Sequence, residues 1–174
     1  KNYSAPMNKI IDATDTRLKE KGDRLRDIER QLPSLRSTLE IYKKKPDSDE
    51  YKRAEREYNE LRYEQGKLRG EINDLDKSRS RAISLKSKIT TGEDADSYRR
   101  GVSLMTARGY KTGHAVAIID EIKTTRDKTK LRQIGEKLKE EGIFNKNHPK
   151  FNSELMKYFT KLLGQRSRII KTLR

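Results

Sequence analysis

Residues 18–42 read LKEKGDRLRDIERQLPSLRSTLEIY, with a leucine at every seventh position from Leu18 to Leu39. A second set of positions, three residues after each leucine, holds Lys21, Ile28, Leu35 and Tyr42. Positions three and four residues apart share one side of a helix, and an apolar repeat of seven residues is typical of paired helices. The sequence therefore predicts a long helix from about Met7 to Lys44 that packs along a partner helix.

Residues 51–82 carry a matching repeat and are the expected partner. One series of positions holds Tyr51, Tyr58, Gln65, Ile72 and Arg79, and the other holds Ala54, Leu61, Leu68, Leu75 and Ala82. Pro46 ends the first helix because proline cannot continue a helical hydrogen-bond ladder, and Asp47 or Ser48 is suited to cap the second. Residues 43–49 thus form the tip of an antiparallel hairpin, and residues 1–7, which lack a pattern, form a lead-in.

The two repeats also predict a register. If Tyr42 faces Tyr51, the two residue numbers of each facing pair add to 93, which gives Leu32–Leu61, Ile28–Gln65, Leu25–Leu68 and Leu18–Leu75. The polar seam residues Lys21 and Gln65 are expected to fix this register. Beside the seam, three facing pairs have opposite charge: Arg24–Glu71, Glu29–Arg62 and Arg36–Glu55. Asp15 against Asp76 is the exception.

The second half of the chain predicts shorter helices without a seven-residue repeat. We expect them near residues 94–107, 113–123, 127–141 and 151–173, with apolar positions on one side of each. These positions include Val116, Ile119, Ile122, Leu131, Ile134, Leu138, Leu155, Tyr158, Phe159, Leu162 and Leu163. The fold class is therefore all-α: an antiparallel coiled-coil hairpin over residues 1–90, followed by a small helical bundle with a basic C-terminal helix over residues 91–174.

Charge is the strongest functional signal in the composition. The 174 residues carry 42 Lys and Arg against 27 Asp and Glu, a net charge of +15, which favours an anionic partner. Nucleic acid, an acidic protein surface and an anionic membrane surface all meet that description. No apolar run is long enough to span a membrane and no signal peptide is visible. The chain starts at Lys1 rather than Met, which is consistent with a processed product or an excised fragment.

Two basic segments without acidic residues are the candidate phosphate contacts. The first contributes Lys77, Arg79, Arg81, Lys86 and Lys88, and the second contributes Arg166, Arg168, Lys171 and Arg174. At the hairpin tip, Lys43, Lys44 and Lys45 are candidates for partner binding, although Asp47, Asp49 and Glu50 offset their charge. The helices expected between residues 94 and 141 are compatible with a helix-turn-helix, but nothing at their turns favours one.

No residue pattern predicts catalysis, a cofactor or a metal site. His114 and His148 each lack neighbouring ligands, and there is no cysteine. Asp120 and Glu121 are adjacent on a helix and therefore point in different directions. We expect a non-enzymatic binding protein that engages nucleic acid through phosphates. The alternative is a protein-interaction or assembly module, such as a scaffold, virion component or adaptor, whose hairpin docks on a partner.

Overall fold

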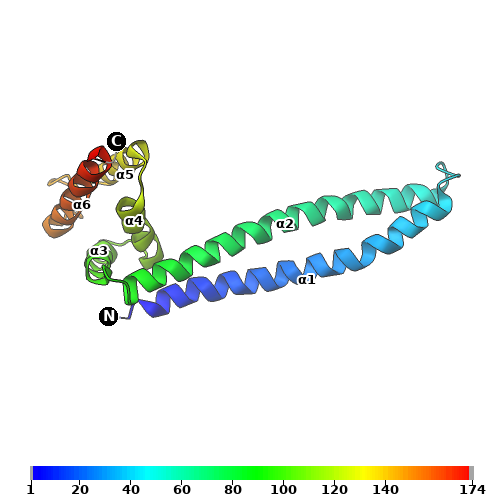
Figure 1. Ribbon diagram of the computed structural model, residues 1–174, viewed down its shortest axis with the longest axis horizontal. Helices are drawn as coiled ribbons and strands as arrows, with labels where there is room; N and C mark the ends of the chain where they lie inside the picture. Colours follow the sequence, from blue (N-terminus) through cyan, green and yellow to red (C-terminus); the bar gives the residue numbers. More distant parts are fainter. Residues whose placement is uncertain (1, 173–174) are drawn as a thin grey trace. The chain divides into compact units, whose positions relative to one another are not determined.

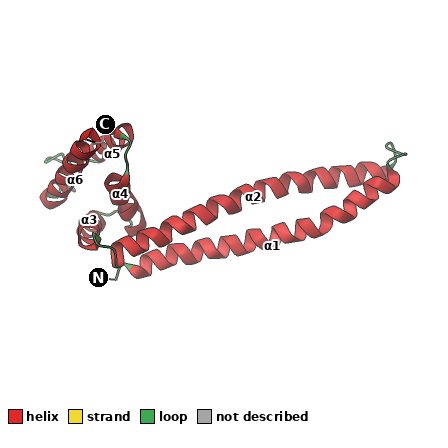
Figure 2. Ribbon diagram, viewed as in Figure 1, coloured by secondary structure: helices red, strands yellow, loops and turns green. Residues whose placement is uncertain are grey.

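The computed structural model describes residues 2–172, and these residues form helices and connecting loops without strands (Figure 2). The helices are α1 (Ser4–Tyr42), α2 (Asp49–Thr90), α3 (Ala95–Ala107), α4 (Thr112–Thr124), α5 (Lys128–Glu140) and α6 (Ser153–Thr172). The all-α class and the order of the predicted helices are confirmed. None of the helices in this described range combines the length and the apolar character needed to cross a bilayer.

The chain divides into two compact units, and the division falls inside α1 and α2. Residues 11–81 form the first unit, here called the hairpin arm. Residues 1–10 and 82–174 form the second, here called the helical unit. In the arm, α1 and α2 run antiparallel and meet at the tip, as the ribbon in Figure 1 shows. The predicted hairpin is therefore present.

The apolar repeat forms the seam of the hairpin arm. Ile28, Leu32 and Leu68 are buried together, and Leu25, Tyr58 and Leu61 pack against them. These residues come from both helices at the positions that the predicted register pairs. Gln65, opposite Ile28 in that register, is only 6% exposed. Burial of this narrow stripe is what holds the two long helices together, since most other arm side chains are exposed.

Ion pairs between the arm helices agree with the register but not with the predicted partners. Three contacts join residues within one position of the predicted register: Lys21–Glu71 at 2.5 Å, Asp15–Arg79 at 2.5 Å and Arg36–Tyr58 at 3.3 Å. The expected pairs of Arg24 and Glu29 are wrong by one helical repeat, because Arg24 bonds Glu64 at 2.5 Å and Glu29 lies 3.7 Å from Arg69. Glu71 already binds Lys21, and this contact lowers the pKa of the Glu71 carboxyl. The long Arg24 side chain therefore reaches the next acid along α2.

The tip of the hairpin and the interior proline of α1, Pro33, are explained by their local surroundings. The Ser48 hydroxyl accepts a hydrogen bond from the Tyr51 amide at 3.2 Å, which confirms Ser48 as the cap of α2. Pro33 lies inside α1 with its side chain exposed, so the residue that cannot donate a backbone bond sits on the outer face. Neither feature interrupts the seam.

The register makes a crosslinking prediction in this cysteine-free chain. Cysteines replacing Leu18 and Leu75 are expected to form a disulfide within one molecule, because facing seam positions bring the Cα atoms near disulfide range. Cysteines replacing Leu18 and Leu61 should stay reduced, because 14 residues displace them by about 21 Å along the helix. Oxidation followed by non-reducing gel electrophoresis and mass spectrometry distinguishes the two. Crosslinks found only between molecules would contradict the hairpin.

The helical unit has its own apolar core. It is built from α3 to α6, the end of α2 and the start of α1: Met7, Leu85, Ile89, Tyr98, Val102, Met105, Ala115, Val116, Ile119, Ile122, Leu131, Leu138, Ile143, Leu155, Phe159, Leu162 and Ile170. The prediction of an unpatterned lead-in at residues 1–7 was wrong. Helix α1 already begins at Ser4, and Met7 is 1% exposed because it packs into this core.

Caps and glycines fix where the short helices begin and end. Helices α3 and α5 are each followed by a glycine with positive φ, Gly109 at 114° and Gly142 at 85°. Residues that have a Cβ atom are strained in this conformation, whereas glycine adopts it readily. Helix α5 is capped by the preceding Asp127, whose carboxylate accepts from the Thr129 and Lys130 amides. Helix α6 starts after Asn152, whose side-chain oxygen accepts from the Glu154 and Leu155 amides.

Candidate nucleic-acid interface

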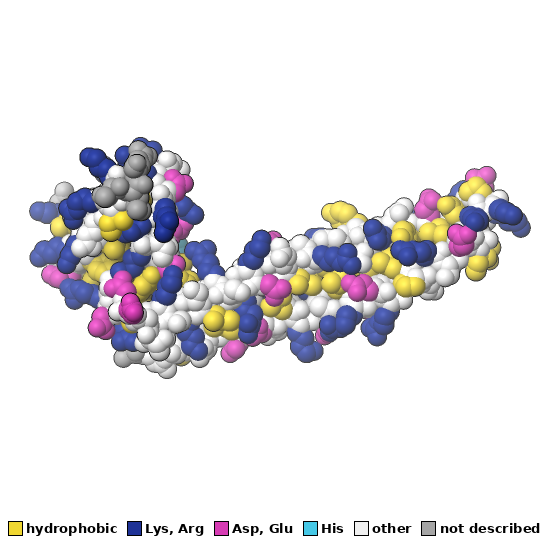
Figure 3. Space-filling model, in the orientation of Figure 1, with side chains coloured by type: hydrophobic (Ala, Val, Ile, Leu, Met, Phe, Trp, Pro, Cys, Tyr) yellow, Lys and Arg dark blue, Asp and Glu magenta, His cyan; other side chains and the backbone are white. Residues whose placement is uncertain are grey.

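Positive charge is concentrated in one of the two units. The hairpin arm holds 19 basic and 17 acidic residues, a net charge of +2, whereas the helical unit holds 23 basic and 10 acidic residues, a net charge of +13. Figure 3 shows the contrast: basic and acidic side chains alternate along the arm, while basic side chains dominate the visible face of the helical unit. An anionic partner is therefore attracted mainly to the helical unit.

The predicted cations of α2 have different surroundings. Lys77 and Arg81 are exposed, and Lys86 is half-buried. Arg79 is held by Asp15 in the arm, and Lys88 binds the Asp120 carboxylate of α4 at 2.6 Å. Of the five predicted contacts, Arg79 and Lys88 thus already have an anionic partner inside the protein. The sequence run without acids does not show this, because the acids come from elsewhere in the chain.

Asp120 links Lys88 to the buried side chain of Tyr98. The Tyr98 hydroxyl donates to the same carboxylate oxygen at 2.8 Å, and the Lys123 ammonium lies 5.1 Å above the centre of the Tyr98 ring. Burial, together with the neighbouring Asp120, raises the pKa of Tyr98 well above its ordinary value. Tyr98 therefore stays a neutral donor at neutral pH, and the group joins α2, α3 and α4. The adjacent Glu121 instead binds Lys130 of α5 at 2.8 Å, so the two acids serve separate contacts.

The predicted cations of α6 also differ in role. Arg166 donates to the backbone carbonyls of Ile122 at 3.1 Å and Thr125 at 2.5 Å, so it caps the end of α4. Arg168 and Lys171 are exposed, while Arg174 lies outside the described residues. Arg166 is therefore a structural residue, and the outward-facing part of the predicted set on this helix is Arg168 and Lys171.

The three tip lysines are all exposed at the end of the hairpin arm. Lys43 binds Glu40 one helical turn earlier at 2.5 Å. Lys44 and Lys45 lie in the turn before α2, close in sequence to the acidic residues Asp47, Asp49 and Glu50. This local mixture of charges matches the near balance of the arm as a whole.

Several exposed cations of the helical unit were missed by sequence reasoning. Helix α5 presents five of them, and α6 and the preceding loop add more: Lys128, Lys130, Arg132, Lys137, Lys139, Lys146, Lys150, Lys157 and Lys161. A signal was available in the sequence, because the predicted apolar positions of residues 127–141 leave every lysine and arginine of that helix on its outer side. This signal was missed because only basic runs without acidic residues were taken as candidates, and Glu136 and Glu140 lie among these cations.

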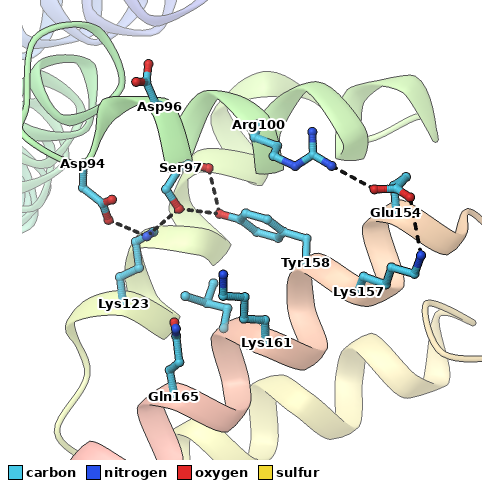
Figure 4. Close-up of a pocket in the computed structure, with 11 residues that line it drawn as sticks. Asp94, Asp96, Ser97, Arg100, Lys123, Glu154, Lys157, Tyr158, Lys161 and Gln165 are labelled. Atoms are coloured by element: carbon cyan, nitrogen blue, oxygen red, sulfur yellow. Dashed lines mark hydrogen bonds and ion pairs between the residues drawn. The ribbon is translucent and has the colours of Figure 1, made fainter.

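A groove of about 600 Å³ lies between α3, α4 and α6 (Figure 4). Its cationic lining residues are Arg100, Lys123, Lys157 and Lys161, and its acidic lining residues are Asp94, Asp96 and Glu154. Arg100 binds Glu154 at 2.9 Å, and Glu154 lies 3.7 Å from Lys157. Because both cationic and acidic residues line the groove, its charge favours neither an anionic nor a cationic ligand.

The centre of this groove is a network that ties three helices together. The Lys123 ammonium binds Asp94 and donates to the Ser97 hydroxyl at 2.8 Å, and its side chain is only 13% exposed. The Tyr158 hydroxyl of α6 donates to the Ser97 carbonyl at 2.9 Å, and burial raises the pKa of Tyr158. Figure 4 shows these groups converging from three helices. Each of these groups is engaged by another, and together they connect α3, α4 and α6.

Both histidines lie near the loops that follow the C-terminal ends of α3 and α5. His114 stacks on Tyr110 at 5.9 Å between ring centres. The Tyr110 hydroxyl donates to the Glu141 carboxylate, and burial together with Glu141 raises the pKa of Tyr110 to about 12. Arg108 bonds the Lys150 carbonyl at 3.2 Å, and His148 accepts from the Lys150 amide at 3.0 Å. These contacts hold the α3–α4 loop against the α5–α6 loop.

Within residues 2–172, no group of three or more His, Cys, Asp or Glu side chains is placed to hold a metal ion. The polar side chains described above form helix-to-helix networks or belong to the exposed cationic surface. Comparisons with protein-family models, with curated proteins and with solved structures found no match to this chain.

Proposed function

We propose that the protein binds nucleic acid without catalysis, and that the helical unit is the part that binds. The observation that carries this proposal is the division of charge, +13 on the helical unit against +2 on the hairpin arm. A phosphate backbone is the most densely charged anionic partner in a cell, and cations that neutralise it release bound counterions. A compact body of this size with such an excess is suited to that exchange.

The exposed cations support phosphate contact rather than a closed binding pocket. They are lysines and arginines on the outer faces of α5 and α6, including Arg132, Lys139 and Lys171. Long cationic side chains on convex helices reach phosphates on the outside of a nucleic acid. The groove of about 600 Å³ between α3, α4 and α6 is a weaker candidate because acidic residues line it too.

A salt titration tests this function. Binding of a labelled DNA duplex should weaken steeply with salt, with about 0.9 of log–log slope for each phosphate contact. The double variant Lys161→Gln, Lys171→Gln removes two exposed cations of α6, so the slope should fall by about 1.8 and the affinity should drop for every sequence tested. Arg166 is unsuited to this test because it caps α4.

The matched control removes the same charge from the arm. The variant Lys44→Gln, Lys45→Gln changes two exposed tip lysines and should leave the affinity and the slope nearly unchanged. Equal effects of the two double variants would show that net charge alone, and not the helical unit, governs binding. Absence of salt-dependent binding at physiological ionic strength would refute the proposed function.

Assembly through the hairpin arm is the second candidate function. Two large apolar side chains are strongly exposed on the arm, Ile41 at 74% near the tip and Tyr63 at 77% on α2. With nearly balanced charge, a coiled-coil arm of this kind fits a protein partner better than a polyanion. The tip lysines Lys43, Lys44 and Lys45 would then meet an acidic part of that partner. Recovery of a bound protein that persists after nuclease treatment would favour this function.

A further inference from the structure

Helix α5 is the most outward-facing helix of the helical unit. Its buried residues are Leu131 and Leu138, and Ile134 and Gly135 are half-buried beside them. The nine other residues of Lys128–Glu140 are exposed. A helix held by one narrow apolar line leaves more than half of its circumference free for a partner.

The exposed residues of α5 are arranged in bands. Thr129, Arg132, Gln133 and Glu136 have the spacing of one helical stripe, and this stripe lies opposite the buried line of Leu131, Ile134 and Leu138. Lysines border the stripe on both sides. Lys128 and Lys139 lie along one border, and Lys137 lies along the other beside Lys130, which Glu121 of α4 binds. Hydrogen-bonding side chains therefore run along the middle, with cations at both edges.

This arrangement matches the base edges and the two phosphate backbones that a DNA groove presents. The major groove of B-form DNA is about 12 Å wide and admits one α-helix, whose central side chains face base edges while its borders face the two phosphate backbones. Arginine pairs with guanine and glutamine pairs with adenine through two hydrogen bonds each. Arg132 and Gln133 are residues of those types, and both lie in the half of the stripe that holds no acid. Glu136 and Glu140 lie in the other half, which would lie farther from the base edges.

The connection before α5 has the length of a helix-turn-helix. Only residues 125–127 separate α4 from α5, and such motifs use turns of three or four residues. Asp127 caps α5 through the Thr129 and Lys130 amides, so the start of the helix is fixed. The buried residues Ile122 of α4 and Leu131 of α5 belong to one core, which fixes the second helix on the first. In this motif the first residues of the second helix reach the bases.

We propose that α5 enters the major groove of double-stranded DNA and reads bases with Arg132 and Gln133, while Lys128 and Lys139 contact phosphates. This proposal rests on the proposed nucleic-acid function and narrows it to B-form duplex DNA. Duplex RNA is excluded as the partner of this face, because the major groove of an A-form duplex is too deep and narrow for a helix. The base preference is therefore a property of a few side chains on a general phosphate-binding surface.

Selection from a DNA duplex pool with a randomised centre tests the proposal. The wild-type protein should enrich a short common sequence and should bind it more tightly than duplex RNA of the same sequence, by at least about tenfold. The variant Gln133→Ala keeps the net charge, so its binding to unselected duplexes and its salt dependence should not change. Its preference for the enriched sequence over a single-base variant should fall, by roughly 5–100-fold at the base that Gln133 reads.

Two further variants separate this inference from the proposed function. Lys128→Gln, Lys139→Gln should weaken binding to all duplexes and lower the salt slope by about 1.8 while the enriched sequence stays the same. Gln31→Ala, an exposed glutamine of the arm, is the uncharged control and should change nothing. If the wild-type protein binds duplexes with salt dependence but enriches no sequence, or if it binds duplex RNA equally well, the α5 proposal is wrong while the proposed function stands. If it binds no nucleic acid, both are wrong.

Discussion

Replacing Phe159 by alanine is expected to lower the free energy of unfolding of the helical unit by about 3–5 kcal/mol. Phe159 is fully buried in the core of the helical unit and meets the Tyr158 ring edge to face at 5.5 Å. Alanine loses the transfer energy of the ring and leaves a cavity among closely packed neighbours. Urea unfolding followed by circular dichroism measures the loss. For one domain of this size such a change is a large part of the total stability.

The control for this prediction is an aromatic residue that is exposed rather than buried. Tyr63 is 77% exposed on α2, so Tyr63→Ala should change stability by no more than about 0.5 kcal/mol. If the two units unfold separately, the loss in Phe159→Ala should appear in one transition while the transition of the arm is unchanged. Equal effects of Phe159→Ala and Tyr63→Ala would contradict the assigned core.

The hairpin could be predicted because its signal is repeated. Leucines at seven-residue intervals identify the seam many times over, and an error at one position does not change the result. Its ion pairs were predicted less well for a physical reason. Arg24 reaches Glu64 rather than Glu71, because long charged side chains have several partners within reach and each exposed pair contributes little energy. Spacing therefore determines the backbone register but not the pattern of surface salt bridges.

Met7 shows what a repeat cannot reveal. Tyr3, Met7 and Ile10 have the spacing of one side of a helix, but they precede the seven-residue series that starts at Leu18, so that repeat does not identify what Met7 contacts. Its burial depends on Leu85 and Ile89, which belong to the same core and lie far away in sequence. Contacts between distant segments are set by the tertiary fold, and a single sequence carries little trace of them.

Sequence reasoning identified only some of the exposed cations, for the same reason. A cation is available to a partner only if no acid or carbonyl of the protein already binds it. Lys88 is held by Asp120, and Arg166 is held by the carbonyls of Ile122 and Thr125 at the end of α4. These partners come from elsewhere in the chain. For α5 the sequence contained enough information to predict which cations are exposed, because the positions of Leu131 and Leu138 identify the side that faces outward.

Replacing a glycine by alanine is expected to lower stability at one position of the helical unit and to raise it at one position of the arm. In the helical unit, a Cβ on Gly101 would lie 2.5 Å from the Tyr158 ring and 2.6 Å from the Ile119 side chain. In the arm, a Cβ on Gly66 would meet no described atom within 4 Å. Both glycines lie inside helices, where alanine is otherwise favoured by about 0.5–1 kcal/mol. The surroundings therefore decide the sign.

Gly101→Ala should destabilise the helical unit by about 1–3 kcal/mol, because neither neighbour has room to move. The Tyr158 hydroxyl is anchored to the Ser97 carbonyl, and Ile119 is fully buried. Gly66→Ala should instead stabilise the arm by about 0.5–1 kcal/mol through the lower conformational freedom of the unfolded chain. Urea unfolding of the two single variants and of the double variant measures both effects, which should add because the sites share no contact. Stabilisation by Gly101→Ala would mean that α3 does not approach α4 and α6 as closely as the packing around Gly101 requires.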